Sequence, residues 1–515
     1  MNHVYLGVDL GTSSVKCLAM NLQGQCLSQG EGRYPLYAPK PGWVEQNPDE
    51  WMEPVYSAIL DCLRGLKNCE PVALSFSGHM SSLVVLDDNF APLLPCSLVG
   101  DTRASKQADE LKAQFGNSFV ETTGNVPWQA FIVSKLLWIK QELPDIYRKI
   151  NKFIVAKDYI RYKMTGELCT DYTDAGNTLL YNPKTKQWDD SLIAVAGLNK
   201  QIFPRLIAPT DHCGAINSHA AQVTGLPEGL PVICGAADMA CSQIGTGGVN
   251  PERLIITLST SGQMCMNVNQ PSIYAKEKIT FHPGVESMYA MASVFSGGLA
   301  VNWGFSLLSG QNPSDISDFE SLGRFAKEIE SFSPGQSGIT FLPFLTGSGS
   351  PHNNSEDKAH LVGMTLSSDR RDVMHAIMEG VAYNLRENSD VFRQLGSWKE
   401  VRLGGGGANM KVWRHIIADV LGVDLNILQT GNASAVGACI LAMVGIGAAD
   451  SVLDLSEKIV VCDDRIEYDR GKKQEYDYLY EEYRTIYKAL CANHNTPLFK
   501  GGGRHGRTGE TEGQS

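Results

Sequence analysis

Two short motifs of the same kind, one at the start of the chain and one near its middle, constrain the fold most strongly. In the first, the apolar run Val4–Val8 leads to Asp9, and a glycine turn with hydroxyl side chains precedes a second apolar run. In the second, Thr257–Gly262 overlaps the end of the apolar run Leu254–Leu258 and turns into another. Leu, Thr and Ser coincide when the motifs are aligned, and each lies at the first hairpin turn of its half. The repetition predicts a duplicated domain.

The first motif places one carboxylate beside a turn suited to phosphate. Glycine lets a backbone come close to a ligand, and successive N–H groups in a turn form an anion-binding concavity. Asp9 suits Mg²⁺, a hard cation that takes few protein carboxylates together with phosphate oxygens and water. Taken alone, the same residues also fit an ordinary β-hairpin with a glycine turn.

The size and composition are those of a well-packed protein with more than one core. At 515 residues the chain is too long for a single domain. Hydrophobic residues make up 43% and charged residues 19% of it. The net charge of −12 argues against sequence-independent binding of nucleic acid, which needs a basic surface. A local phosphate pocket remains compatible with that charge.

Cysteine usage and the N-terminus predict a cytoplasmic protein. The 13 cysteines are scattered without a CxxC pair, which is typical of free thiols in a reducing compartment rather than of a zinc site. The first residues lack the basic and apolar regions of a signal peptide. The uncharged stretch between Asp424 and Asp450 is interrupted by polar residues and is rich in Ala and Gly, so we expect a buried helix there and no membrane span.

Short β-like runs alternate with helical ones, which favours an α/β architecture. Expected strands are Val4–Val8, Cys17–Leu22, Val72–Phe76, Leu83–Asp87, Pro231–Cys234, Leu254–Leu258, Gln263–Val268, Ile339–Leu342 and Val401–Leu403. Expected helices are Asp49–Leu66, Ser134–Gln141, Asp158–Thr165 and Asp369–Phe392, the last capped by Ser368 or Asp369. A breaker-rich link at 245–251 separates predicted domains 1–248 and 249–497, and the polar, glycine-rich tail 498–515 is expected to be disordered.

Three further positions have residues that fit either a functional or a purely structural role. Asp238 follows a strand and small residues, so it could reach a substrate hydroxyl as a general base or cap the following helix. Four consecutive glycines, Gly404–Gly407, lie between a strand and a helical run, where a nucleotide can lie against the backbone. They match neither a P-loop nor a dinucleotide fingerprint, and a plain flexible loop is the alternative. His352 is expected to be a hydrogen-bonded loop histidine rather than a catalytic group.

Together these segments resemble the FGGY carbohydrate kinases, of the sugar kinase/actin/Hsp70 ATPase superfamily, and most closely their xylulokinase branch. The resemblance runs from about Val4 to about Ala449. It rests on Gly7–Ser14, Trp43–Gln46, Lys157–Tyr159, Met164–Glu167, Gly235–Asp238, Leu258–Gly262, Phe341–Leu345, Pro351–Asn354, Glu379–Val381, Gly405–Ala408 and Trp413. It implies an α/β fold of two ribonuclease-H-like domains, of the actin/hexokinase/Hsp70 ATPase type, around a central cleft.

By position, the resemblance also implies roles for individual residues. Asp238 matches the catalytic base and Asp9 the carboxylate near Mg²⁺ and the transferred phosphate. The implied ATP contacts are Thr12, Ser13, Thr260, Ser261, Gly405, Gly406, Ala408 and Asn409. The implied sugar contacts are Met80, Ser81, Asp101, Arg103, Asp238 and Met239. The family often forms dimers, so a homodimer is compatible with the resemblance.

The sugar pocket departs from the xylulokinase pattern. Gly78-His79-Met80-Ser81 stands where Gly-Gln-Met-His is usual, Met239 replaces an Asn, and Gly347-Ser348-Gly349 replaces Gly-Glu-Arg. Of a usual Trp-Asn-Asp-x-Arg, this chain keeps the Asp and the Arg. Changes among polar groups that pair with sugar hydroxyls alter specificity strongly. The resemblance still makes a pentulose such as D-xylulose, phosphorylated by ATP on a terminal primary hydroxyl, the leading candidate. The altered pocket residues keep the identity of the substrate open.

Other functions stay open at this stage. The alternatives are a kinase for another pentulose, a tetritol or glycerol, and a non-catalytic binding protein with the ATPase fold. A dinucleotide oxidoreductase fits less well, because its glycine fingerprint is missing.

Overall fold

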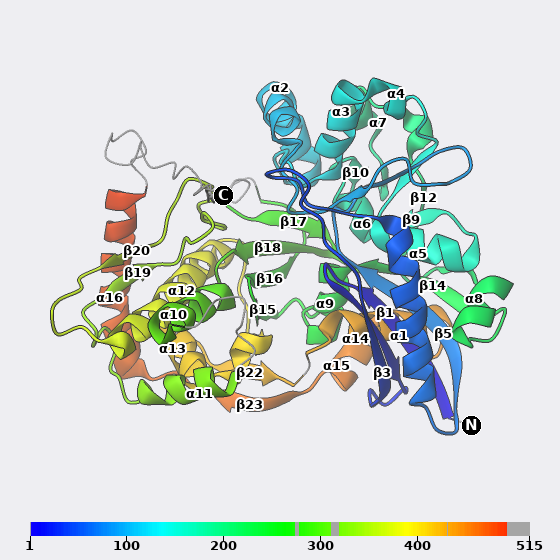
Figure 1. The fold of residues 1–515 in the computed structure, drawn as a ribbon. Coiled ribbons are helices and arrows are strands. Elements are labelled where there is room, and N and C mark those ends of the chain that lie inside the picture. The colour runs from blue at the N-terminus through cyan, green and yellow to red at the C-terminus, as the bar shows by residue number, and fades with distance from the viewer. Residues whose placement is uncertain (1, 273–277, 311–318, 430, 492–515) are drawn as a thin grey trace, which may run out of the picture.

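The computed structural model describes residues 2–272, 278–310, 319–429 and 431–491; of residues 319–321 it describes the backbone alone. It contains two large mixed β-sheets, one in each half of the chain, that lie next to each other (Figure 1). The tail 498–515, predicted to be disordered, lies outside the described residues, as does the last part of the predicted domain 249–497.

The first sheet has six strands in the order β13-β14-β5-β1-β2-β3. Their bounds are β13 (His212–Ala215), β14 (Pro231–Ala237), β5 (Cys69–Gly78), β1 (Asn2–Leu10), β2 (Ser14–Met20) and β3 (Cys26–Arg33). Strands β14, β5 and β1 are parallel to one another. Strand β2 runs antiparallel to β1, and β3 runs antiparallel to β2. The central strand β1 is buried along nearly its whole length, as a strand covered on both faces should be.

The second sheet has seven strands in the order β17-β18-β16-β15-β21-β22-β23. Their bounds are β17 (Thr280–Pro283), β18 (Met288–Val294), β16 (Gly262–Val268), β15 (Arg253–Leu258), β21 (Glu400–Gly404), β22 (Leu425–Leu428) and β23 (Cys462–Ile466). Here β15, β21 and β22 are parallel to one another. Strand β16 runs antiparallel to β15, and β18 runs antiparallel to β16. The run β18-β16-β15-β21-β22 thus repeats β3-β2-β1-β5-β14 in order and direction, as a duplication predicts.

Helices cover both sheets. In the first half they are α1 (Met52–Arg64), α2 (Ser105–Thr123), α3 (Ile132–Glu142), α4 (Pro144–Tyr147), α5 (Ala156–Thr165), α6 (Tyr172–Gly176), α7 (Asp190–Val195), α8 (Ser218–Thr224) and α9 (Asp238–Thr246). In the second half they are α10 (Gly298–Ser309), α11 (Phe319–Glu328), α12 (Arg370–Arg393), α13 (Lys411–Leu421), α14 (Ala433–Gly445), α15 (Val452–Ile459) and α16 (Arg470–Leu490). Short 3₁₀ turns are Pro48–Trp51, Lys200–Ile202 and Gly406–Asn409.

Small two-stranded sheets complete the fold. They pair β10 (Tyr181–Asn182) with β11 (Gln187–Trp188), β12 (Arg205–Ile207) with β9 (Cys169–Asp171), β19 (Thr340–Leu342) with β20 (His360–Val362), β4 (Glu45–Gln46) with β7 (Cys96–Ser97), and β6 (Val84–Leu86) with β8 (Lys152–Ile154). Helices α2, α3 and α7 share a separate apolar core with β6 and β8.

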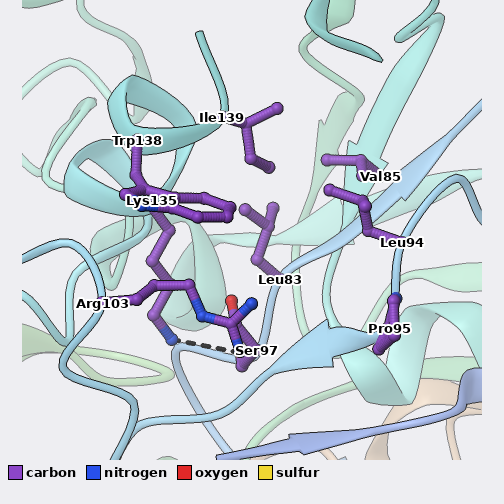
Figure 2. A pocket seen from close by; sticks show the side chains of 9 residues that line it. All are labelled: Leu83, Val85, Leu94, Pro95, Ser97, Arg103, Lys135, Trp138 and Ile139. Atoms are coloured by element: carbon purple, nitrogen blue, oxygen red, sulfur yellow. Dashed lines mark hydrogen bonds between the residues drawn. The ribbon is translucent and has the colours of Figure 1, made fainter. Parts of the chain in front are cut away.

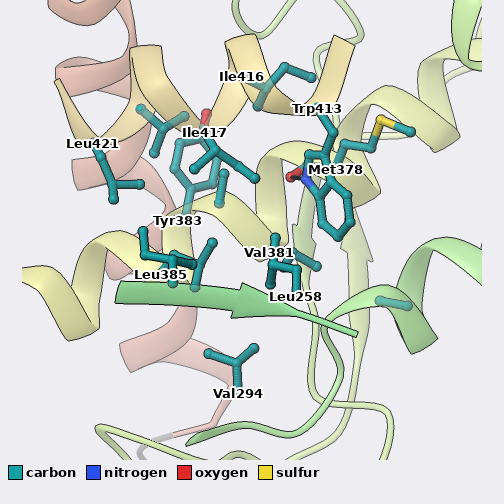
Figure 3. Close-up of a cluster of buried hydrophobic side chains, with 14 of the residues drawn as sticks. Leu258, Val294, Met378, Val381, Tyr383, Leu385, Trp413, Ile416, Ile417 and Leu421 are labelled. Atoms are coloured by element: carbon teal, nitrogen blue, oxygen red, sulfur yellow. Dashed lines mark hydrogen bonds between the residues drawn. The ribbon is translucent and has the colours of Figure 1, made fainter. Parts of the chain in front are cut away.

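The long helix α12 shows how the sequence pattern becomes packing. Asp369 caps it by accepting from the backbone N–H groups of Arg371 and Asp372, and Asp372 completes a capping box. Its apolar face packs under the second sheet and against α13, where the indole of Trp413 donates to the carbonyl of Met378 over 3.1 Å (Figure 3). The predicted helix Asp369–Phe392 is confirmed to within one residue at either end.

Helices α9 and α14 join the two halves. The expected buried helix between Asp424 and Asp450 is confirmed as α14, which packs on β1 and α9 although it belongs to the second half. Contact is backbone to backbone: a Cβ on Gly437 would overlap the carbonyl oxygen of Cys241, and one on Gly7 would overlap that of Ala435. Glycine is required at such crossings.

Candidate functional site

The parallel strands of the first sheet bring Asp9 and Asp238 to one edge. Asp9 is paired in register with Ser77, and Ala237, which precedes Asp238, is paired with Gly78 on the same strand, β5. Asp9 thus lies near the end of β1 and Asp238 directly after β14, and these strands are two spacings apart, roughly 10 Å. Ligands of open α/β sheets bind outside the carboxyl ends of the parallel strands, so this edge is the place for chemistry.

Asp9 is held in one orientation and is costly to ionise. The hydroxyl of Ser77 donates to its Oδ1 over 2.6 Å. Burial raises the pKa of Asp9, while the Ser77 hydrogen bond and the charge of Lys16 act in the opposite direction. Asp9 is half-buried near the end of its strand. A carboxylate placed in this way, with another carboxylate near it, is a suitable ligand for a hard divalent cation. The residues present therefore fit Mg²⁺.

Asp238 is the first residue of α9. The backbone N–H of Met239 donates to its Oδ1 over 2.7 Å, and the backbone N–H of Met80 also donates to the carboxylate. Burial, with the charge of Asp9 as the second cause, raises the pKa of Asp238 to about 7. The capping interpretation holds only in part, since the N-cap residue is Ala237. A carboxyl with a pKa near neutrality is well suited to accept a proton.

The two hydroxyl-bearing turns lie at equivalent places in the two sheets. In the first, Thr12 and Ser13 are exposed, and the turn is closed by the N–H of Gly11 donating to the carbonyl of Ser14 over 2.9 Å. In the second, Thr260 is exposed and the N–H groups of Gly298 and Leu299 donate to the carbonyls of Ser259 and Thr260. The start of α10 thus holds the second turn, which includes the half-buried Ser261.

The glycine segment lies against the second turn. Gly404 is paired in register with Thr257, and Gly405 has a φ of 86° with no room for a Cβ beside the carbonyl of Leu258. The next four residues form one 3₁₀ turn, Gly406–Asn409, rather than a flexible loop. Its ends, Gly406 and Asn409, are exposed while Ala408 is buried. An exposed backbone edge thus lies directly beside the turn that carries Thr260.

The loop after β5 carries Met80 and Ser81. Both are buried, and Ser81 has the left-handed φ of 60° that residues with a Cβ seldom adopt. Lys135 of α3, 2% exposed, holds this loop, because its Nζ donates to the carbonyls of Ser81 at 2.6 Å and Leu98 at 2.7 Å. It also donates to the carbonyl of Ser97 at 3.1 Å, the bond drawn in Figure 2. Burial lowers the pKa of Lys135 to about 8. This role of Lys135 is not visible in the sequence, because it depends on carbonyls from distant segments.

Asp101 and Arg103 bind each other tightly. The guanidinium of Arg103 donates from Nη2 to Asp101 Oδ2 and to Glu45 Oε2, both at 2.6 Å, and lies 3.6 Å from the ring centre of Trp43. Arg103 and Lys135 line a cavity of about 10 Å³, room for one water at most (Figure 2). Among the described residues, no hydrogen bond joins Asp101 or Arg103 to Asp9 or Asp238. Their contact with sugar remains a prediction.

His352 behaves as predicted. Its Nε2 is 3.1 Å from both carboxylate oxygens of Glu387, and its ring stacks on Tyr487 with centroids 3.8 Å apart. The loop after the cis Ser350-Pro351 bond is therefore held by a satisfied histidine.

Two family models match nearly the whole chain. The N-terminal domain of the FGGY family of carbohydrate kinases matches residues 4–245, and the C-terminal domain of that family matches residues 255–446. The chain belongs to the FGGY family of carbohydrate kinases. The resemblance inferred from the sequence is confirmed, and so is the α/β fold of two domains of the actin/hexokinase type.

Relatives of this FGGY kinase differ in the substrate that their names state. It is 31% identical to the xylulose kinase of Bacillus subtilis, over 94% of this chain and 96% of that protein. It is 28% identical to the gluconokinase of Bacillus licheniformis, over 89% and 91%. The crystal structure of a xyloylose kinase from Brucella ovis matches with a TM-score of 0.86 and 28% identity, covering 95% of this chain and 100% of that one.

Family membership makes this protein a carbohydrate kinase of the xylulokinase-like kind that uses ATP as phosphate donor. No helix in the described part of the chain combines the length and apolar character needed to cross a bilayer.

Proposed function

We propose that this FGGY kinase transfers the γ-phosphoryl group of ATP to a terminal primary hydroxyl of a pentulose such as D-xylulose, with Asp238 as general base. The observation that carries the proposal is the pair of half-buried carboxylates Asp9 and Asp238, in which desolvation, and after it the charge of Asp9, raises the pKa of Asp238 to about 7. The names of the B. subtilis and Br. ovis relatives support a pentulose.

In this mechanism Asp238 removes the proton of the attacking hydroxyl. The N–H groups of Met239 and Met80 hold its carboxylate in place, so the base is oriented before the sugar binds. A base whose pKa lies near the working pH is deprotonated often enough to act and still basic enough to take the proton. The sugar hydroxyl must lie within hydrogen-bond reach of the free part of this carboxylate.

Asp9 is proposed to hold Mg²⁺, in the orientation that the Ser77 hydroxyl gives it. When bound, the metal ion supplies charge neutralisation for the transferred phosphate. Thr12 and Ser13 on one side, and Thr260 and Ser261 on the other, would donate to the phosphates. Gly405, Gly406, Ala408 and Asn409 would line the adenosine, where exposed backbone lies next to the Thr260 turn.

For the sugar, we propose contacts with Met80, Ser81 and Met239, beside the base. The loop of Met80 and Ser81 is fixed by Lys135 and presents one of its N–H groups to Asp238. Asp101 and Arg103 would act as a rigid ion pair. The polar groups that this pocket offers differ from the usual xylulokinase set, so the pentulose must be identified by experiment.

The experiment is a screen of ATP consumption with pentuloses, hexuloses, tetritols, glycerol and gluconate, measured as ADP release by the full-length protein. D-xylulose or another pentulose is expected to give the highest kcat/KM. A clear preference for gluconate or glycerol would overturn the pentulose assignment, and stimulation by none would favour a non-catalytic ATPase-fold binding protein. An Asp61→Asn variant, altered at an exposed carboxylate on α1, is the control for Asp238→Asn.

We also propose that the protein is cytoplasmic and, as the family resemblance allows, that it forms a homodimer. The 13 cysteines lie within the described residues and all of them are free thiols, which suits a reducing compartment. Sedimentation of the full-length protein would measure the oligomeric state, and a monomer at all concentrations would remove the dimer from the proposal.

A further inference from the structure

Three cysteines that are far apart in the sequence meet inside the first half of the molecule. Cys169 lies on β9, Cys213 on β13 and Cys234 on β14, with exposures of 0%, 1% and 0%. Their sulfur atoms all lie within 4.8 Å of one another, and those of Cys169 and Cys213 are 2.8 Å apart. The kinase reaction uses none of them.

A buried cation faces this trio of sulfurs. The guanidinium of Arg161, on α5 and fully buried, donates from Nη2 to Cys169 Sγ and from Nη1 to Cys234 Sγ, each over 3.3 Å. The same nitrogens donate to the carbonyls of Cys234 at 2.8 Å and Cys169 at 2.5 Å, which fixes the guanidinium plane. Donors aimed at sulfur from a buried cation favour the thiolate, the form of cysteine that binds metals. Arg161 is also paired with Asp158 over 2.8 Å, and burial raises the pKa of Cys234, so a metal ion must displace the proton of that thiol.

The donor set selects the kind of metal ion. Three thiolates are soft ligands, which favour Cu(I) or zinc over magnesium, calcium or manganese. Structural zinc takes four ligands, and in the described part of the chain no fourth His, Cys, Asp or Glu joins this group. Metal–sulfur bonds of roughly 2.3 Å would place the sulfurs of a trigonal site about 4 Å apart. The sulfurs of Cys169 and Cys213, which are 2.8 Å apart, must therefore separate on binding, while all three stay within the 4.8 Å that the group spans.

We propose that Cys169, Cys213 and Cys234 form a trigonal thiolate site for one Cu(I) ion. Three Cu–S bonds form, each thiol releases its proton to solvent, and copper remains Cu(I), so no electron is transferred. Arg161 offsets part of the negative charge of the loaded site. Entry requires local opening, because all three residues of β9 are buried; among the described strands this short strand pairs only with β12.

The site is separate from the kinase residues but connected to them. Cys234 lies on β14, the strand that leads to Asp238. Cys169 begins β9, and two residues after that strand Thr173 accepts a hydrogen bond from the N–H of Ala237 over 2.9 Å. A metal ion that ties β9 to β14 would therefore stabilise the folded protein by mass action.

The test is an anaerobic titration of the reduced full-length protein with Cu(I) held by bicinchoninate as a competing chelator. We expect one equivalent to bind with near-ultraviolet charge-transfer absorption and a higher thermal midpoint. Cys213→Ser is expected to weaken binding by at least about 100-fold, because even outer-shell changes at metal sites cost 10–100-fold. Cys265→Ser, at a buried cysteine on a different sheet, should bind as the wild type does.

A variant that fails to fold would not leave the question open, because the wild-type stoichiometry and Cys169→Ser provide independent tests. Wild-type protein that takes up no copper from the chelator would overturn the proposal. Equal uptake by the wild type, by Cys213→Ser and by Cys169→Ser would also overturn the proposal, since the copper would then be bound to other thiols.

Discussion

At the scale of single residues, the site depends on a few buried charges that restrain one another. Asp9 raises the pKa of Asp238, and the backbone donors that hold Asp238 act in the opposite direction. The balance leaves one carboxyl that can both hold and release a proton near neutrality. Burial alone would have raised the pKa of any carboxyl here, but the hydrogen bonds also fix its direction.

The first prediction concerns pH. The base must be ionised, and burial, with the charge of Asp9 second, raises the pKa of Asp238 to about 7 in the metal-free protein. Because Mg²⁺ at Asp9 offsets part of that charge, kcat/KM for the sugar is expected to fall as pH drops from about 7 or somewhat below, and to level off above it. The fall should approach tenfold per pH unit well below that value. Steady-state rates between about pH 5.5 and 9, with binding of ATP as the control, measure it. A profile that is flat over this whole range would contradict the assignment.

The second prediction concerns Lys135. Replacement by Met removes the donor of three buried carbonyls, and a buried polar group left unpaired costs about 1–3 kcal/mol. We expect Lys135→Met to lower the free energy of unfolding by about 2–4 kcal/mol and to raise KM for the sugar more than KM for ATP. Lys106→Met, at an exposed site on α2, should do neither. Equal rises in both KM values would show that Lys135 is only structural.

At the scale of elements, the second half of the chain contributes a helix to the first. Helix α14 lies on β1 and against α9, with glycines at the crossings. Other contacts across the junction come from side chains: Lys16 donates to Asn432 over 3.0 Å, and Ser434 donates to the carbonyl of Asp238 over 3.1 Å. The helix that carries the proposed base is thus fixed directly to the other half.

The third prediction tests this crossing. In Gly437→Ala the new Cβ meets the carbonyl of Cys241, so the helices must separate and the free energy of unfolding should fall by about 1–3 kcal/mol. In the control Gly323→Ala, on α11, a Cβ has nothing within 4 Å, and helix propensity predicts a gain of about 0.5–1 kcal/mol. Denaturant unfolding compares them. Equal effects would mean that α9 and α14 do not pack closely.

The elements were largely predictable from local patterns, whereas several functional contacts were not. The strand-turn-strand motif at Asp9, the α12 helix with its Asp369 cap, and the loop histidine His352 follow from spacing and residue type. Lys135 and the cysteine trio do not, because their partners come from strands and loops that only the folded chain brings together. The spacing of the cysteines along the chain does not indicate that trio.

At the scale of the whole molecule, two sheets of the same topology carry the proposed site residues at the same end of their parallel strands. The end of the first sheet carries Asp9 and Asp238, and that of the second carries Thr260 and Gly405. The family assignment explains this arrangement, since one domain would hold the sugar and the other the nucleotide. Transfer then requires both, and excluding water would keep ATP from hydrolysis without sugar.

The fourth prediction is that the domains close. With D-xylulose and a non-hydrolysable ATP analogue together, the radius of gyration of the wild-type protein in small-angle scattering should decrease. Either ligand alone should give a smaller decrease, because neither contacts both halves fully. An unchanged radius with both ligands bound would indicate a rigid cleft.

The most direct test of the central claim is the rate of ADP release by Asp238→Asn with D-xylulose, beside a measurement of ATP binding. If Asp238 is the general base, the variant binds ATP as the wild type does and loses phosphorylation by at least about 100-fold, since a general base contributes 10²–10⁴-fold. Near-normal turnover by this variant would contradict the account.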